Sequence, residues 1–376
     1  MGVAVTILIF IGVLAVLILV HELGHFVTAR LFGVRVLEFG IGYPPRLVGI
    51  RWGETLYSLN LLPLGGFVRL EGEEAPTSPR SLASKGILTR FTILIAGSAM
   101  NALLPLVIFS ALFMVPTPEV QGKVAVVSVA PDSPAAKAGL KPGDIILSID
   151  GHPIRNNGDL SRLVRLNLGR PTVWEVERPT YLLTQPIGGG GEFGGGRPPV
   201  AKVERFTTVV TPRWRFPEGQ GPTGILVRVW EPQVVQRSEP FWRAVPLGAV
   251  RLWEVLILFR NEVIRAIIGG SSFQFAGPIG IAQATGEVAQ LGWMALLQWT
   301  ALLSLNLAIL NVLPIPMLDG GRLLFLAIEF VRRGKRISPQ REGLVHFIGF
   351  IVLLLFIVIV SYFDIVRLLR GENLIR

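Results

Sequence analysis

An uninterrupted apolar run from Val3 to Val20 constrains the fold of this chain more than any other stretch of its sequence. A helix of about 20 apolar residues is long enough to cross the hydrocarbon core of a bilayer. Four apolar runs are long enough to span: about Val3–Ala29, Phe91–Val115, Trp293–Ile315 with a continuation towards Phe330, and Leu344–Ile365. Hydrophobic residues make up 51% of the chain and charged residues 16%, which also favours several spans and a polar domain. We therefore predict a polytopic α-helical membrane protein with four transmembrane helices.

Two histidines and a glutamate follow directly on the first apolar run, in the order His21-Glu22-Leu23-Gly24-His25. Positions i and i+4 of a helix share a face, so both imidazoles can reach one metal ion while Glu22 stands beside its open position. Ionisable groups at membrane depth cost roughly 2.5–3.5 kcal/mol each, so three together need a compensating partner. The spacing, which is that of zinc proteases, predicts that His21 and His25 bind zinc. The alternative is a pair of buried histidines that satisfy each other.

A third ligand is needed before a catalytic water completes four-coordinate zinc. The chain has no cysteine, so this ligand must be His, Asp or Glu. Pro314 and Pro316 interrupt the third apolar run, and Asp319 follows the interruption directly. Pairing with the zinc explains a carboxylate at this depth better than helix capping, the alternative role for Asp319.

Basic residues cluster in two loops between the predicted spans. The first loop holds Arg30, Arg35, Arg46, Arg51, Arg69, Arg80, Lys85 and Arg90, and the second holds Arg332, Arg333, Lys335, Arg336 and Arg341. No Lys or Arg precedes span one, so the positive-inside rule places both loops in the cytoplasm and both termini outside. The metal motif then lies near the cytoplasmic end of span one. Since no small-residue cleavage site follows the first run, we expect it to be retained.

The loop between spans one and two is predicted to form a sheet. Short strands are expected at Val36–Ile41, Arg46–Arg51 and Thr55–Asn60, with a further apolar strand over Leu62–Leu70 that contains Gly65 and Gly66. The last strand lacks the clean polar and apolar alternation of a soluble hairpin. We therefore expect the sheet to enter the membrane beside the metal, where its edge would hold an extended substrate.

The remaining sequence divides into a β-rich domain, a linker and a second membrane part. We predict a membrane part at 1–120, a β-rich domain at 121–213, a linker at 214–292 and a membrane part at 293–376. Residues 178–201 are rich in Gly and Pro, which predicts a flexible insertion in the β-rich domain. Charged residues recur on one face of Phe241–Ile268, so we expect an amphipathic helix at the outer membrane interface rather than a fifth span. The net charge of +10 comes with no nucleic-acid-binding motif, so no nucleic-acid partner is expected.

Five motifs lie in order along most of the chain, at His21–His25, Pro63–Gly66, Gly139–Asp144, Gly277–Ile279 and Asn306–Gly321. Together they resemble the site-2 proteases, intramembrane zinc metalloproteases, and specifically the bacterial members that carry a PDZ domain. Two features depart from that family. Gly97-Ser98 stands where Gly-Pro is usual before the span-two Asn, and one candidate PDZ domain with a Gly-rich insertion stands where many relatives have two domains.

The resemblance implies roles for individual residues in peptide-bond hydrolysis with Zn²⁺ as cofactor. It implies that Asp319 is the third zinc ligand and that Asn311 helps to hold the substrate or the developing oxyanion. Glu22 would take a proton from the attacking water and pass it to the leaving amine.

The resemblance also implies a membrane-reentrant β-hairpin and an inserted β-rich PDZ domain. The hairpin would present substrate as an added strand, through the backbone of Gly65, Gly66, Phe67 and Val68. The implied substrates are transmembrane proteins cut within or next to their spans, as in regulated intramembrane proteolysis of anti-sigma factors or signal-peptide remnants. The implied place is the bacterial inner membrane, with the PDZ domain outside the cytoplasm, where it filters substrates by size or binds a C-terminal peptide.

Two other classes of protein are open to a chain with this composition. A zinc-dependent transporter would need ionisable residues along several spans, whereas they cluster here at the metal motif and Asp319. A membrane scaffold would have no use for Glu22. Within the spans, Asn101 is expected either to join two helices or to take part in the site, and His346 is expected to be structural.

Overall fold

The computed structural model describes residues 2–73, 75–181, 200–217, 219–270 and 276–370. These residues fall into two units. The first, here called the membrane unit, comprises Met1–Leu112, Phe241–Leu252 and Gln274–Arg376. The second, here called the β-rich unit, comprises Phe113–Pro240 and Trp253–Phe273.

Four helices in the described residues are long and apolar enough to cross a membrane, as predicted. They are α1 (Val3–Leu31), α2 (Ile87–Met114), α7 (Trp293–Val312) and α9 (Pro339–Leu369). Only 11% of the most apolar stretch of α1 and 6% of that of α9 is buried inside the protein. These helices therefore present their large apolar side chains outward, as lipid-facing helices do.

The third apolar run does not continue as one helix. α7 ends at Val312, and α8 (Asp319–Val331) begins at Asp319 after a short turn. Pro314 and Pro316 explain the break, because a proline has no N–H to donate and its ring clashes with the preceding helical turn. A further helix, α6 (Pro278–Gln290), packs against α1.

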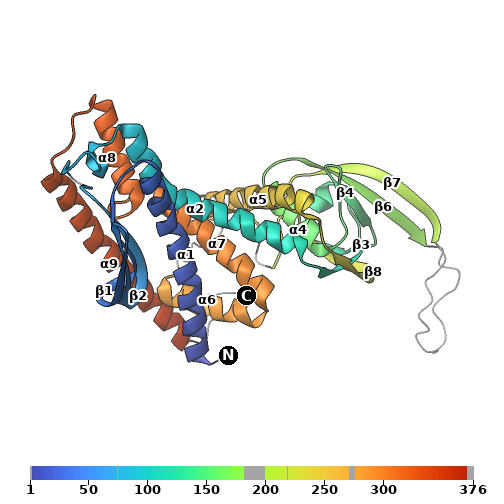
Figure 1. Cartoon of the computed structure of the whole chain (residues 1–376). Coiled ribbons are helices and arrows are strands. Elements are labelled where there is room, and N and C mark those ends of the chain that lie inside the picture. The colour runs from blue at the N-terminus through green and yellow to red at the C-terminus, as the bar shows by residue number, and fades with distance from the viewer. Residues whose placement is uncertain (1, 74, 182–199, 218, 271–275, 371–376) are drawn as a thin grey trace. The chain divides into compact units, whose positions relative to one another are not determined.

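The loop between α1 and α2 forms a β-layer that lies against α1 (Figure 1). It consists of two long antiparallel strands, β1 (Val36–Trp52) and β2 (Thr55–Leu70), with a 3-10 turn at Leu82–Ser84 after them. Phe39 pairs with both Tyr57 and Val68, so β2 lies on both sides of the first part of β1. The layer therefore has four rows, in the order 66–70, 36–41, 55–60 and 46–52, close to the predicted short strands. Segment 66–70 forms an outer row, with no second strand pairing among the described residues.

The β-rich unit contains one antiparallel sheet in the order β7-β6-β4-β3-β8. Its strands are β3 (Thr117–Val129), β4 (Ile145–Ile149), β5 (His152–Pro153), β6 (Thr172–Tyr181), β7 (Val200–Val210) and β8 (Ile225–Arg237). It also contains the short helices α3 (Pro134–Lys137) and α4 (Asn157–Leu166), and Trp174 is fully buried in its core.

Two details of this unit differ from the sequence prediction. β8 lies in the stretch assigned to the linker at 214–292, yet its pairing with β3 makes it part of the sheet. β6 extends to Tyr181 and β7 begins at Val200, so both ends of the predicted insertion at 178–201 are strand. The glycine runs themselves, within 182–199, lie outside the described residues.

The helix expected near Phe241–Ile268 is α5 (Phe241–Ile267), and it is not among the four candidate spans. In the β-rich unit, Glu254 of α5 accepts a hydrogen bond from Arg162 of α4. Asn261 donates to the carbonyl of Arg165 at 2.8 Å. Part of its polar face therefore binds protein, while its place at a membrane interface stays a prediction.

Candidate metal centre

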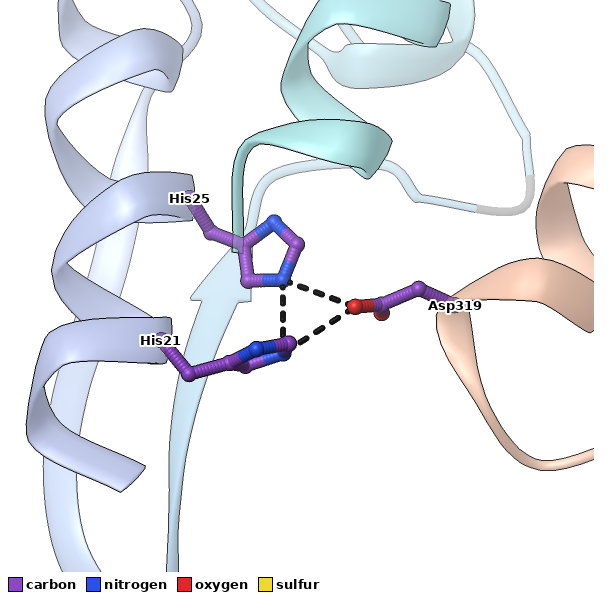
Figure 2. A group of neighbouring side chains, drawn as sticks. All are labelled: His21, His25 and Asp319. Carbon is purple, nitrogen blue, oxygen red and sulfur yellow. Dashed lines mark hydrogen bonds and ion pairs between the residues drawn. The ribbon is translucent and has the colours of Figure 1, made fainter. Parts of the chain in front are cut away.

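Three side chains converge in the membrane unit (Figure 2). His21 and His25 lie one turn apart on α1, and Asp319 is the first residue of α8. The Asp319 Oδ2 atom lies 3.0 Å from His21 Nε2 and 3.1 Å from His25 Nε2, and the two nitrogens are 3.2 Å apart. Ligands of tetrahedral zinc are about 3.3–3.4 Å apart when each bond is about 2.0–2.1 Å long. The three donors therefore fit a single zinc ion.

Asp319 reaches this position because two glycines follow it. A Cβ atom on Gly320 would lie 1.9 Å from the carbonyl oxygen of Leu313, and one on Gly321 would lie 2.7 Å from that of Ile315. Only residues without side chains allow the start of α8 to pack so closely under the break. Leu318, not Asp319, is the N-cap residue of α8, so the geometry does not support the capping alternative.

Hydrogen bonds on the far side of each ring orient the two imidazoles. His25 Nδ1 lies 2.8 Å from the carbonyl oxygen of Ile93. A carbonyl oxygen can only accept a hydrogen bond, so Nδ1 carries the hydrogen and the lone pair of Nε2 is left for the metal. His21 Nδ1 lies 3.3 Å from the side-chain amide of the fully buried Asn101. Asn101 thus joins α2 to α1 through His21, and a role in the site itself stays a prediction. A zinc bond from His21 Nε2 requires the amide oxygen of Asn101 to face Nδ1, an orientation that the equal size of the two amide atoms allows.

Gly97 of α2 lies directly beneath the two rings, and the sequence analysis did not single it out as a site residue. A Cβ atom there would lie 2.4 Å from His25 Nε2 and 2.6 Å from His21 Cε1. On the facing helix, a Cβ on Gly24 would lie 2.4 Å from the carbonyl oxygen of Ala96. The signal that could have found Gly97 is its spacing of one helical turn from Asn101, since small residues in spans mark close helix contacts.

Glu22 stands between the ligands and the β-layer. It lines the same cavity as the three ligands, and its carboxylate faces the backbone N–H of Val68. A Cβ on Gly66 would lie 2.8 Å from Ile18 Cγ2 and 3.2 Å from Glu22 Cγ. Gly66 therefore permits the outer row of the layer to approach α1 closely.

The cavity at the ligands has a volume of about 380 Å³. Gly66, Phe67 and Val68 line it together with residues of α8 and α9. Gly65 instead lines a smaller apolar cavity of about 160 Å³, which shares Glu22 and Gly66 with the first. Asn311 is buried in the last turn of α7 and lines neither cavity.

Two histidines and a carboxylate spaced for zinc, with a glutamate beside them and apolar helices around them, define a membrane metalloprotease. The family model described as peptidase family M50 matches residues 9–356, and the chain belongs to this family. It is a zinc metalloendopeptidase of the site-2 protease type, and its cofactor is Zn²⁺.

Relatives match nearly the whole chain. Zinc metalloprotease RasP of Geobacillus kaustophilus is 30% identical over an alignment that covers 95% of this chain and 96% of the relative. RasP of Oceanobacillus iheyensis is 28% identical over 96% of this chain and 99% of its own length. A protein of Clostridium perfringens is 35% identical over 93% of this chain and 95% of its own length.

Proposed function

We propose that the enzyme hydrolyses peptide bonds within or next to transmembrane segments of other membrane proteins. The observation that carries this proposal is the position of His21, Glu22 and His25 inside α1, one of the four candidate spans. A bond cut by this site must therefore be brought to the depth of α1 in the bilayer. Regulated intramembrane proteolysis, with anti-sigma factors or signal-peptide remnants as substrates, is the process that such a site serves.

The site residues have distinct proposed roles. His21, His25 and Asp319 hold the zinc, which when bound acidifies a water and polarises the scissile carbonyl. Glu22 takes the proton of the attacking water and passes it to the leaving amine. Asn311 is a proposed donor to the oxyanion, on the family resemblance alone.

The first experiment replaces Glu22 by Gln. This substitution removes the base and keeps the size of the side chain, so cleavage should be lost while zinc stays at wild-type stoichiometry. The readouts are cleavage of a transmembrane substrate in proteoliposomes and the zinc content of the purified protein. Full activity of this variant would overturn the proposed mechanism.

The second experiment tests Asp319. Loss of a metal ligand should strip zinc, whereas loss of a helix cap costs only about 1 kcal/mol of stability and leaves the metal in place. Asp319→Ala should therefore purify folded, with little zinc and no activity. Wild-type zinc content in this variant would mean that the third ligand lies elsewhere.

We further propose that segment 66–70 receives substrate as an added strand. The N–H of Val68 faces Glu22, and the N–H of Leu70 donates to Glu73 Oε1 at 2.9 Å. Because donors alternate along a strand, the N–H of Gly66 points to the same side. A substrate strand on this side would exchange its helical hydrogen bonds for bonds to the edge.

A proline scan of the substrate tests strand addition. Proline cannot donate to a ladder, so cleavage should fall at every second substrate position near the cut. Replacing Val68 by Pro would be a poorer test, since it also removes the N–H that faces Glu22. A loss without alternation would remove strand addition from the mechanism.

The remaining proposals concern domains and orientation. We propose that the hairpin re-enters the membrane, and that the β-rich unit is a PDZ domain that filters substrates by size or binds a C-terminal peptide. We place the β-rich unit on the outer side of the bacterial inner membrane, because the basic loops are predicted to lie in the cytoplasm. A tag after Arg376 should then be accessible from outside and one near Lys335 should not. The reverse pattern would overturn the orientation.

A further inference from the structure

The chain makes a tight turn immediately before Asp319, at residues 315–318. The N–H of Leu318 donates to the carbonyl of Ile315 at 3.2 Å, which closes a four-residue turn. Pro316 occupies its second position, and Met317 occupies the third with φ +81°. These features define a type II turn.

Methionine is a poor residue for the third position of a type II turn. That position needs a positive φ, which glycine adopts without cost, whereas a residue with a Cβ atom is strained there. A type I turn places the same residue at a negative φ and accepts most side chains. The two forms differ by a rotation of the peptide between the second and third residues. This rotation reverses the direction of the Met317 N–H, so an acceptor on one side of the turn can select one form.

His346 of α9 supplies that acceptor. The N–H of Met317 donates to His346 Nδ1 at 2.8 Å. The imidazole also packs against α8, since its ring centroid lies 5.5 Å from that of Phe325. A Cβ on Gly321 would lie 3.2 Å from His346 Cε1, so the ring packs directly on the start of α8.

We propose that His346 is a positioning residue, whose Nδ1 selects the type II form of the 315–318 turn and thereby aims the Asp319 carboxylate at the two histidines. Asp319 follows this turn directly. A rotation of the peptide between Pro316 and Met317 would therefore change the direction in which the chain enters α8. Ligand geometry tolerates shifts of only about 0.5 Å, which makes the form of the turn decisive for the site. The inference rests on the proposed role of Asp319 as a zinc ligand.

The experiment compares acceptors at position 346 in the full-length protein, with zinc affinity as the readout. Asn places an oxygen where His has Nδ1, whereas Gln moves the oxygen one bond further and Leu has no acceptor. His346→Asn should bind zinc close to wild type, while His346→Gln and His346→Leu should bind it about tenfold more weakly. Phe347→Leu, at an exposed neighbouring position on α9, is the matched control and should not change the affinity. Equal zinc binding by the Asn and Leu variants would overturn the proposal.

A second variant tests the turn itself. Met317→Gly removes the cost of a positive φ, so the type II form no longer depends on the hydrogen bond from position 346. On the His346→Leu background this substitution should restore most of the lost zinc affinity, whereas alone it should change little. No recovery in the double variant would mean that His346 does not act through the turn.

The results for Asp319 separate the two proposals. If Asp319→Ala keeps its zinc, the ligand set itself is wrong. If Asp319→Ala loses zinc but the His346 series binds it uniformly, only the positioning role fails.

Discussion

The core of the β-rich unit and the helix contacts beneath the candidate metal centre are built from different kinds of residue. In the β-rich unit the fully buried side chains are mostly large and apolar, including Trp174, Ile146 and Ile149. In the membrane unit the positions beneath the metal site are small or polar: Gly97, Asn101 and Ser304 of the neighbouring helix α7. Many large apolar side chains of α1 and α9 are instead exposed, among them Leu8, Phe347 and Phe363.

The difference follows from the surroundings of the two units, water for the β-rich unit and lipid for the spans. Burial of apolar surface drives folding in water, at about 25 cal/mol per Å², so a soluble core is filled with large side chains. Lipid is as apolar as leucine, so helices in a membrane associate through close packing and hydrogen bonds. Added volume should therefore damage the membrane unit most, and removed volume the β-rich unit.

The largest effect is expected at Gly97, where an added methyl group would displace both imidazole rings. Gly97→Ala should weaken zinc binding by at least about 100-fold and abolish cleavage. Zinc content and peptidase activity check this. Gly12→Ala is the control, because a Cβ on Gly12 of α1 would meet no atom within 4 Å. Normal zinc binding by Gly97→Ala would contradict the packing described beneath the site.

Removal of volume should have its largest effect at Trp174. Trp174→Ala should destabilise the β-rich unit by about 3–5 kcal/mol, because it leaves a cavity in a core that is otherwise filled. None of the proposed zinc ligands lies in this unit, so zinc content should stay at wild type. The change is measured by denaturant unfolding of the full-length protein, with proteolytic cleavage within residues 113–240 as the readout of unfolding. A loss of stability under about 1 kcal/mol would contradict the claim that the β-rich unit depends on large buried side chains.

A partly buried ion pair tests whether polar contacts also matter in the β-rich unit. Asp144 is 1% exposed at its side chain and accepts hydrogen bonds from Arg178 Nε at 2.7 Å and from the N–H of Lys141 at 2.8 Å. The hydrogen bond to Asp144 holds the pKa of the Arg178 guanidinium above its usual value. Asp144→Asn should cost about 2 kcal/mol of stability, since it removes the charge that Arg178 faces. Arg205, whose own side chain is exposed, pairs with Glu177, and Arg205→Gln should cost less than about 1 kcal/mol by the same unfolding assay.

The smallest effect is expected for a hydrogen bond between spans. Ser304 Oγ donates to the backbone carbonyl of Asn101 at 2.7 Å, in a fully buried position. Ser304→Ala should cost only about 0.6 kcal/mol, the average for such bonds within membranes. Zinc content should not change, and unfolding in detergent measures the loss. A cost above about 2 kcal/mol would show that this bond holds Asn101 and, through it, His21.

The four candidate spans and the proximity of His21, His25 and Asp319 were predictable because their signals are local. An apolar run and a spacing of four residues are read from the sequence itself, and Pro314 and Pro316 marked the break before Asp319. The spacing of Gly97 from Asn101 marks a close helix contact, but the sequence does not show that the two imidazole rings lie against it. The contact of His346 with the turn before Asp319 has no local signal at all, because it depends on how α9 packs. Strand β8 was missed for a related reason: its partner, β3, lies far away in the sequence, so no local turn signal announces the pairing.

The ligand set also bears on how the enzyme is made. His25 and Asp319 are separated by 294 positions, and every predicted span but the last begins before Asp319. A chain still on the ribosome can insert α1 with its two histidines and its glutamate long before the carboxylate exists. On the proposed ligand set, the site of the nascent enzyme stays incomplete until the first three spans have been made. The proposal thus predicts that a partly synthesised enzyme does not cleave the membrane proteins made beside it.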